Sequence, residues 1–125
     1  MTATGWLAFL AAAGVGAPAR YLLDEWVQER TEGDFPMGTL VVNLIGCFVL
    51  GVVTGLGIHH GLDAEASTVL GSGGMGAFTT FSAVSFETVR LVEEGDARAA
   101  ARNVLAQALG GLLAAAAGLA VASLG

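Results

Sequence analysis

The sequence contains no lysine and little charge of any kind. Only 13% of its 125 residues are charged, and the formal net charge is −6 because acidic residues outnumber the five arginines. Nucleic acids and anionic lipid headgroups are bound by clustered basic side chains, which this chain lacks. Binding to nucleic acid is therefore excluded, and the acidic residues are expected in solvated loops.

Residues that build most catalytic and metal sites are equally scarce. Cys47 is the only cysteine, and a small buried apolar role explains it best. His59 and His60 are adjacent at a predicted helix end and point in different directions, which argues against a metal site. Neither a Walker-type phosphate loop nor an HExxH motif occurs. The sequence predicts neither an enzyme nor an ATP-driven pump.

Long uncharged runs are present instead. Hydrophobic residues make up 54% of the chain, and segments 38–58, 66–86 and 103–124 each hold about the 20 residues that a membrane-spanning helix needs. A fourth run opens the chain and is broken only by Pro18 and Arg20. We predict an all-α membrane protein with one domain, residues 1–125, multi-pass in the inner (plasma) membrane. Its four transmembrane helices are predicted at about 4–23, 38–58, 66–92 and 99–124.

Small residues recur every four positions within two of these helices. Gly51 and Gly55 form one pair, and Gly110, Ala114 and Gly118 form a similar stripe in the last helix. Such stripes let helix backbones approach closely in lipid. Packing is the simplest role for them, and four thin helices enclose so little volume that a transport path needs a second subunit.

The segment Gly73–Ser82, GGMGAFTTFS, combines a glycine cluster with hydroxyl side chains inside an apolar run. In hydrocarbon, an interrupted helix is tolerated only where its freed backbone groups are buried in protein or line an ion or water site. We therefore predict a break in the third helix just before Thr79 and Thr80, and a functional centre there.

Several polar side chains lie within or beside the apolar runs. Asn43 lies one turn inside the second helix, with Thr39 one turn before it on the same face. The Asn43 amide can donate two hydrogen bonds to an anion or join helices together. Arg20 either reaches the membrane interface or pairs with Asp24.

The third helix carries further polar candidates beyond the predicted break. Ser82 and Ser85 are three residues apart and can form a hydroxyl track, although serines in membrane helices often bond to their own backbone. Glu87 lies one turn before Arg90, so a local ion pair is its first interpretation and a carboxylate at a pore mouth the second.

Three segments together resemble the Fluc/CrcB fluoride channel family. They are GVGAPARY at Gly14–Tyr21, GTLVVNLIGCFVLG at Gly38–Gly51, and GGMGAFTTFSAVSFE at Gly73–Glu87. The resemblance extends through all four helices in order and spacing. It implies a passive exit route for fluoride that lowers the cytoplasmic concentration, built from two chains packed antiparallel with two pores along their interface.

The resemblance also implies roles for individual residues. A structural sodium ion at the dimer centre would be held by the backbone carbonyls of Gly76 and Thr79. The fluoride pathway would contain a pore asparagine, a pore phenylalanine whose ring edge faces the anion, and a polar track, with two charged residues near the vestibules. The matching residues here are Asn43, Thr39, Phe81, Ser82 and Ser85 for the pathway, and Arg20 and Glu87 for the vestibules.

This sequence departs from the family pattern at two places. The second pore phenylalanine should follow Phe81 by three residues, where Val84 stands. Phe86 is a further two residues along, roughly 200° around the helix, and cannot take over that role. Asn103, Val104 and Gln107 occupy the region of the last helix where a tyrosine and a serine are frequent in the family. A subunit that conducts only in a heterodimer, or not at all, is therefore the alternative function.

A proton-coupled small drug exporter is a weaker alternative, because that chemistry needs a carboxylate deep in the first helix and Gly5–Ala19 has none.

The distribution of the arginines bears on the choice of partner. All of them lie on or near the side with the loops after the first and third helices: Arg20, Arg30, Arg90, Arg98 and Arg102. This bias predicts one fixed orientation, with both termini outside the cytoplasm. A homologous partner inserted the opposite way is then favoured, and a homodimer stays open.

Overall fold

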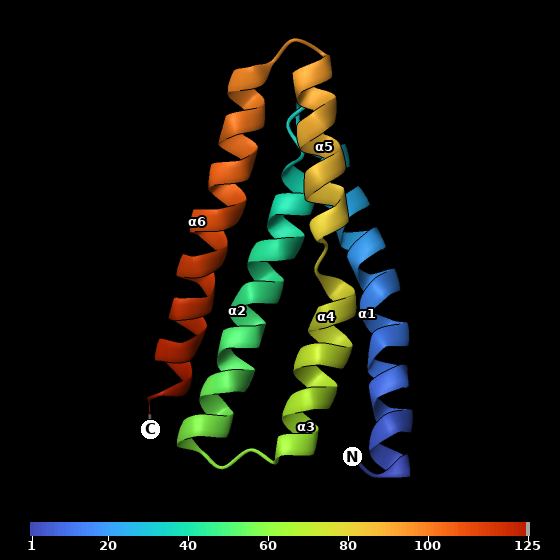
Figure 1. The fold of residues 1–125 in the computed structure, drawn as a ribbon, viewed down its shortest axis with the longest axis vertical. Helices are drawn as coiled ribbons and strands as arrows, with labels where there is room; N and C mark the ends of the chain where they lie inside the picture. The colour runs from blue at the N-terminus through green and yellow to red at the C-terminus, as the bar shows by residue number, and fades with distance from the viewer. Residues whose placement is uncertain (125) are drawn as a thin grey trace.

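The computed structural model describes residues 1–124 and shows a helical chain that passes four times between two ends (Figure 1). Three passes are single helices: α1 (Ala3–Glu29), α2 (Met37–His59) and α6 (Ala97–Ala122). Each is long and apolar enough to cross a membrane. Both termini and the turn after α2 lie at one end, as the sequence predicted for four spans.

The third pass is composite, which confirms the prediction of a broken helix. Its parts in order are α3 (Ala64–Thr68), the π-helical η1 (Val69–Met75), α4 (Gly76–Phe78) and α5 (Phe81–Glu93). The interruption falls on Thr79 and Thr80 themselves, and Gly76 is still helical. The glycine cluster thus lies in a π-helical segment and at the start of α4, and the helix does not end at these glycines.

Close approach of α1 explains the glycine cluster. A methyl group at Gly16 would overlap the carbonyl oxygen of Gly74, and one at Gly73 would lie 3.1 Å from the carbonyl oxygen of Phe9. Both η1 and α4 pack against α1, whereas α5 packs against α6. The break therefore transfers the third pass from one neighbour to the other, and Figure 1 shows α5 beside α6 at the far end of the bundle.

The first helix is longer than predicted. Hydropathy placed its end near residue 23, but α1 continues to Glu29 and the chain turns only at Gly33, whose φ is +85°. The residues that follow Leu23 are more polar, but the helical backbone hydrogen bonds continue through them to Glu29. Hydropathy therefore marks where the apolar surface ends, and the helix itself ends only near the glycine and Pro36.

The small-residue stripes have the predicted packing role, and the structure shows that they lie at the contact between α2 and α6. A methyl group at Gly51 would overlap the backbone carbonyl of Ala115, and one at Gly118 would overlap that of Phe48. At Gly55 the added carbon would lie 2.6 Å from the Ala122 methyl group. The two backbones thus touch along most of their length, which in lipid supplies packing that the hydrophobic effect cannot.

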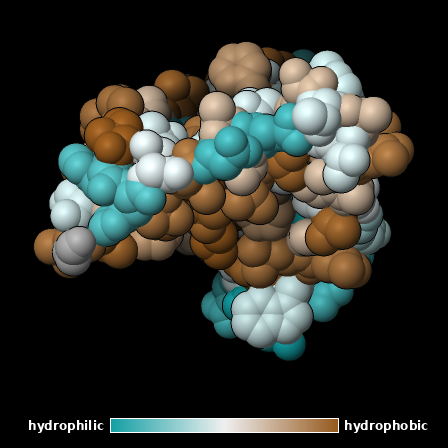
Figure 2. Space-filling model, turned by 90° about the horizontal axis from the view of Figure 1, so that it is seen from below, coloured by the Kyte–Doolittle hydropathy of each residue, from teal (hydrophilic) through white to brown (hydrophobic). Residues whose placement is uncertain are grey.

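The outer surface of the bundle is largely apolar. Leu112 and Leu113 of α6 are 70% and 72% exposed, and many other large apolar side chains are exposed as well. Figure 2, viewed toward the end with the termini, shows hydrophobic flanks behind a mixture of hydrophilic and hydrophobic residues. Such a surface suits a bilayer or a partner helix in place of water.

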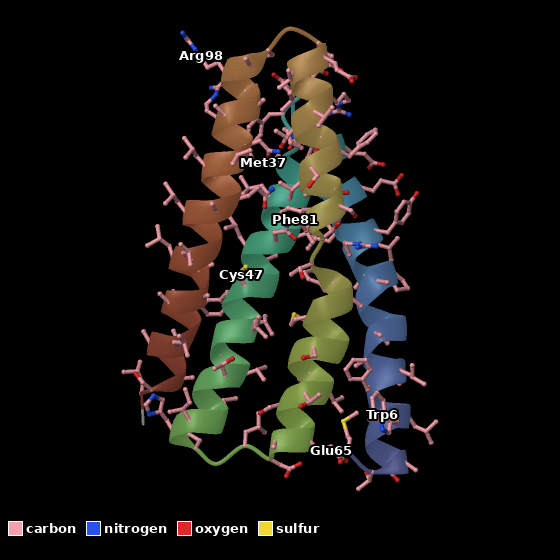
Figure 3. The ribbon with its side chains drawn as sticks, viewed as in Figure 1. Trp6, Met37, Cys47, Glu65, Phe81 and Arg98 are labelled. Carbon is pink, nitrogen blue, oxygen red and sulfur yellow. The ribbon has the colours of Figure 1, made fainter. Side chains whose placement is uncertain are left out.

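The charged groups gather at the two ends of the bundle. Figure 3 shows Glu65 at one end and Arg98 at the other. At the first end, the backbone N–H and the hydroxyl of Thr2 donate to the Glu65 carboxylate at 2.9 and 2.8 Å. These hydrogen bonds hold the pKa of Glu65 below its usual range and tie the residues before α1 to the first turn of α3.

We predict that Gly51→Ala destabilises the fold by about 1–3 kcal/mol, because its methyl group forces the backbones of α2 and α6 apart. Gly14→Ala is the matched control, since nothing lies within 4 Å of the added carbon in α1. Unfolding in mixed micelles by sodium dodecyl sulfate, followed by circular dichroism, measures the difference. Equal stability of the two variants would contradict the assigned contact.

Candidate functional site

The interruption at Thr79 and Thr80 is held by one side chain of α2. Both threonines have extended backbone angles, so the regular helical hydrogen bonds stop there. The Thr80 N–H donates to Oδ1 of Asn43 at 2.9 Å, and Nδ2 of Asn43 donates to the Thr80 carbonyl at 3.0 Å. A single amide thus satisfies both backbone groups of Thr80, as the low-polarity surroundings require.

The carbonyls of residues 76–79 lose their helical donors at the same place, and those of Gly76 and Thr79 are among them. In a regular helix the Thr80 N–H would bond to Gly76 and the Ala83 N–H would bond to Thr79. Here the Thr80 N–H goes to Asn43, and the Ala83 N–H goes to the Thr80 hydroxyl at 3.1 Å. The oxygens of Gly76 and Thr79 are therefore free to act as hard oxygen ligands.

The Met75 carbonyl is different, because it accepts from both the N–H and the hydroxyl of Thr79, at 2.9 and 3.0 Å. The Thr79 side chain is consequently occupied within its own turn. Donation uses the only hydrogen of this hydroxyl, so the Thr79 side chain can face a ligand only as an acceptor, as its backbone oxygen does.

A second amide, from α6, reaches the same place. Nδ2 of Asn43 also donates to Oε1 of Gln107 at 2.9 Å. Among residues 1–124, Nε2 of Gln107 is buried without a hydrogen-bond partner. One turn earlier on α6, Asn103 is fully buried and donates to the Thr88 hydroxyl at 3.0 Å. Neither amide was assigned a role from the sequence, although polar amides four residues apart in an uncharged run are a signal of one.

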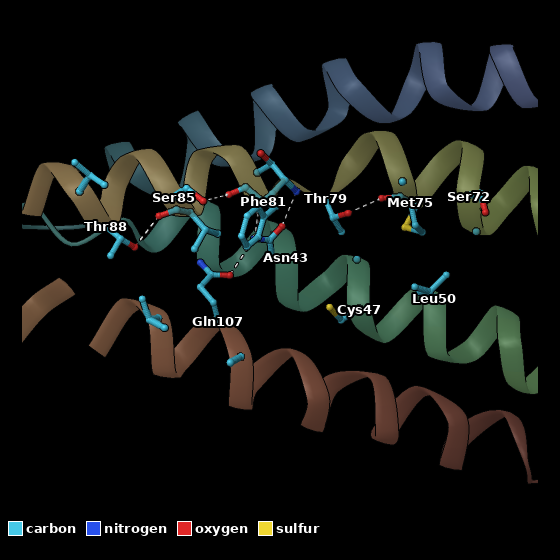
Figure 4. A pocket seen from close by; sticks show the side chains of 18 residues that line it. Asn43, Cys47, Leu50, Ser72, Met75, Thr79, Phe81, Ser85, Thr88 and Gln107 are labelled. Carbon is cyan, nitrogen blue, oxygen red and sulfur yellow. Dashed lines mark hydrogen bonds between the residues drawn. The ribbon is translucent and has the colours of Figure 1, made fainter. Parts of the chain in front are cut away.

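These groups border an open groove of about 770 Å³ between α2, α6 and the third pass (Figure 4). Asn43, Phe81, Ser85, Gly76 and Thr79, all predicted site residues, are among its lining residues. Gln107 and Val84 line it as well. No charged side chain belongs to the lining, so the groove offers only neutral dipoles.

Phe81 and Phe86 differ in their relation to the groove. Phe81 lines it and is 84% exposed, so its ring is barely covered by this chain. Phe86 is 69% exposed and does not belong to the lining. This agrees with the prediction that Phe86 cannot stand in for the phenylalanine that Val84 replaces.

Thr39 and Glu87 form a pair of their own. The Thr39 hydroxyl donates to Oε1 of Glu87 at 2.5 Å, and Thr39 is only 2% exposed. The ion pair predicted between Glu87 and Arg90 is wrong, because Nε of Arg90 lies 3.7 Å from Glu94. The i,i+4 spacing brings Glu94 to Arg90, while α2 supplies Glu87 with a hydroxyl instead.

Of the remaining predicted residues, Ser82 and Arg20 lie outside the groove lining, whereas Ser85 belongs to it. Ser82 is exposed, with its hydroxyl 3.3 Å from that of Thr80, whereas the Ser85 hydroxyl donates to the Phe81 carbonyl at 3.1 Å. Arg20 is half-buried on α1. Within residues 1–124 it forms no ion pair with Asp24, so that interpretation is not supported. Cys47 is half-buried and lines the groove, as a small apolar residue can.

Comparison with known proteins identifies relatives along nearly the whole chain. The family model described as "CrcB-like protein, Camphor Resistance (CrcB)" matches residues 7–119. A protein of Streptomyces avermitilis named fluoride-specific ion channel FluC 1 is 45% identical over 91% of this chain and 92% of its own. The fluoride-specific ion channel FluC 2 of Cutibacterium acnes is 41% identical over 90% and 92%. The fluoride-specific ion channel FluC 1 of Rubrobacter xylanophilus is 44% identical over 87% of this chain and 86% of its own.

Proposed function

Because this chain belongs to the CrcB family, we propose that it is a subunit of a fluoride-specific ion channel in the plasma membrane. It gives fluoride a passive exit route and so lowers the cytoplasmic concentration of the ion. Relatives that bear this name match the chain over most of their length and its own. The proposal makes the chain a transport protein, with no catalytic residues.

The observation that carries the proposal is the uncharged, polar part of the groove. Fluoride is small and strongly hydrated, so a selective path must replace its water by several weak donors, since one deep well would trap the ion. The groove supplies amides and hydroxyls at the helix break and no charged group. Phe81 adds a ring edge with partial positive charge. The Thr39–Glu87 pair and Arg20 belong to the approaches of this path, where charge collects ions without trapping them.

A second, homologous subunit packed antiparallel completes the path. The groove is open along one side, and Phe81 is 84% exposed on that side of the third pass. A closely packed partner helix would bury this ring and turn the open groove into a closed passage. Two related chains inserted in opposite directions give the antiparallel arrangement that the family resemblance implies.

A structural sodium ion at the centre of that dimer is the cofactor we propose. The carbonyls of Gly76 and Thr79 have lost their helical donors, and the same two oxygens from each subunit would surround one small cation. Unwound carbonyls suit sodium because their dipoles are negative and flexible in position. A dimer structure solved in sodium should show one cation on the two-fold axis, and an axis without cation density would contradict the site.

We expect Phe81→Ile to lower fluoride efflux about tenfold, because it removes the polarised ring edge from the groove. Phe86→Ile is the matched control, since it deletes a ring that is also largely exposed but lies outside the groove. Asn43→Asp should abolish efflux, because a fixed negative charge in a low-dielectric path repels the anion. A fluoride electrode measures efflux from liposomes that contain the chain alone or with a homologous partner.

Wild-type liposomes without fluoride efflux in either form would overturn the channel function. Efflux only with the partner would favour the second candidate, a subunit that conducts in a heterodimer. Val84 is the observation behind that candidate, because it lines the groove where the family pattern calls for a second phenylalanine. Unchanged efflux in both Phe81→Ile and Asn43→Asp would move the path away from this groove.

The charge distribution favours a heterodimer with fixed insertion. Arg30, Arg90 and Arg98 lie near the turns after α1 and α5, and the opposite end, with both termini, has no arginine or lysine. Positive loops stay in the cytoplasm, so both termini belong outside it. A chain that paired with itself in two orientations would need a balanced distribution of arginines.

Single cysteines at Thr2 and at Glu32, with Cys47 replaced, test this orientation. Intact cells are treated with an impermeant thiol reagent, and we expect only the Thr2 site to react because it lies outside. Lysed cells, in which both sites should react, are the control for accessibility. Comparable labelling of the two sites in intact cells would show dual insertion and rule out an obligate heterologous partner.

A further inference from the structure

The hydrogen bonds at the helix break fix the orientation of the Asn43 amide. The Thr80 backbone N–H can only donate, so the atom of Asn43 that it meets at 2.9 Å must be the oxygen. The other atom is then the nitrogen, which meets the Thr80 carbonyl at 3.0 Å and Gln107 at 2.9 Å. Both hydrogens of the Asn43 amide are therefore used within this chain.

The same reasoning fixes the Gln107 amide. A nitrogen that only donates must meet an acceptor, so the atom of Gln107 that faces Asn43 is Oε1. Its Nε2 is left on the other side, where Figure 4 shows the nitrogen directed toward α5, on the side of Ser85 and Thr88. This nitrogen is buried and has no partner among the described residues.

The hydroxyls near this nitrogen have other partners. The Ser85 hydroxyl donates to the Phe81 carbonyl, and the Thr88 hydroxyl donates to the Val84 carbonyl at 2.7 Å. Because the Thr88 hydroxyl already donates, it must accept from Nδ2 of Asn103. Asn103 is thereby also fixed in orientation, and its own oxygen is buried without a partner. The unpartnered amide hydrogens of the groove thus belong to Gln107.

We propose that Nε2 of Gln107 is the amide donor that meets the permeating anion in this chain, while Asn43 acts as a positioning residue that aims it. The inference rests on the proposed fluoride pathway and names a specificity-determining residue within it. A buried N–H without an acceptor is unfavourable, and a small anion in the groove supplies that acceptor. Since only the donor side of Gln107 is free, the site favours an anion over a cation.

The variant Gln107→Met separates this role from a direct role of Asn43. Methionine has a similar length but neither amide atom, so it frees one Asn43 hydrogen for the anion. If Gln107 is the donor, fluoride efflux falls about tenfold, the value of one lost hydrogen bond to a charged group. If Asn43 is the donor and Gln107 merely competes for it, efflux stays equal or rises. An equal or higher rate would therefore overturn the proposal.

A binding readout does not depend on conduction. Fluoride that binds the folded chain should raise its thermal unfolding midpoint in sodium fluoride above that in sodium chloride, and Gln107→Met should remove this difference. Gln28→Met is the matched control, because both amide atoms of Gln28 are partnered, with the Phe35 carbonyl and the Gly38 N–H. It should keep the difference even if the fold is weakened.

The outcomes keep the two proposals distinct. Wild-type protein without efflux, alone or with a partner, overturns the channel function, whereas the fluoride-dependent midpoint still tests Gln107. If Gln107→Met and Asn103→Leu lose efflux and midpoint difference equally, the two orphan amide atoms only share a water, and the donor role is overturned. Loss confined to Gln107→Met supports it.

Discussion

The pair of hydrogen bonds between Asn43 and Thr80 is the interaction on which the arrangement of the third pass depends. In hydrocarbon, unpaired backbone groups cannot turn to water, so a helix can stop in mid-membrane only where a side chain replaces the lost bonds. Asn43 does this with both ends of one amide. The consequence is a change of neighbour: the chain leaves α1 at α4 and continues against α6 at α5.

Close packing of the helices makes this pair of hydrogen bonds possible. Asn43 is short, and it links Thr80 to Gln107 only because α2 contacts α6 at glycine positions such as Gly51 and Gly118. Glycines allow the same close packing between α1 and η1, where Gly16 lies against Gly74. Glycines in this chain therefore act mainly through distance between backbones, and the polar residues work within the narrow spaces that result.

Much of the fold was predictable because it depends on local patterns. Run lengths predicted the four passes, four-residue spacing predicted close packing at the small-residue stripes, and the family pattern drew attention to Asn43. The end of α1 and the exact break were less accessible, because glycine permits an interruption but a tertiary partner decides its place. The Thr39–Glu87 pair and the role of Gln107 depend on groups from two helices, and sequence spacing records only neighbours within one helix.

The groove explains how a neutral site can serve an anion. Its lining has no charged side chain, so attraction comes from amide and hydroxyl dipoles that are already oriented by other bonds. Such preoriented dipoles can replace a hydration shell in small steps, whereas a buried arginine would hold the ion too firmly to release it. The charged side chains of this chain stand outside that groove lining, where Arg20 and Glu87 can act at its approaches and the arginines near one end can set the orientation in the membrane. Permeation thus depends on neutral donors along the path, whereas the direction of membrane insertion depends on arginines near one end of the bundle.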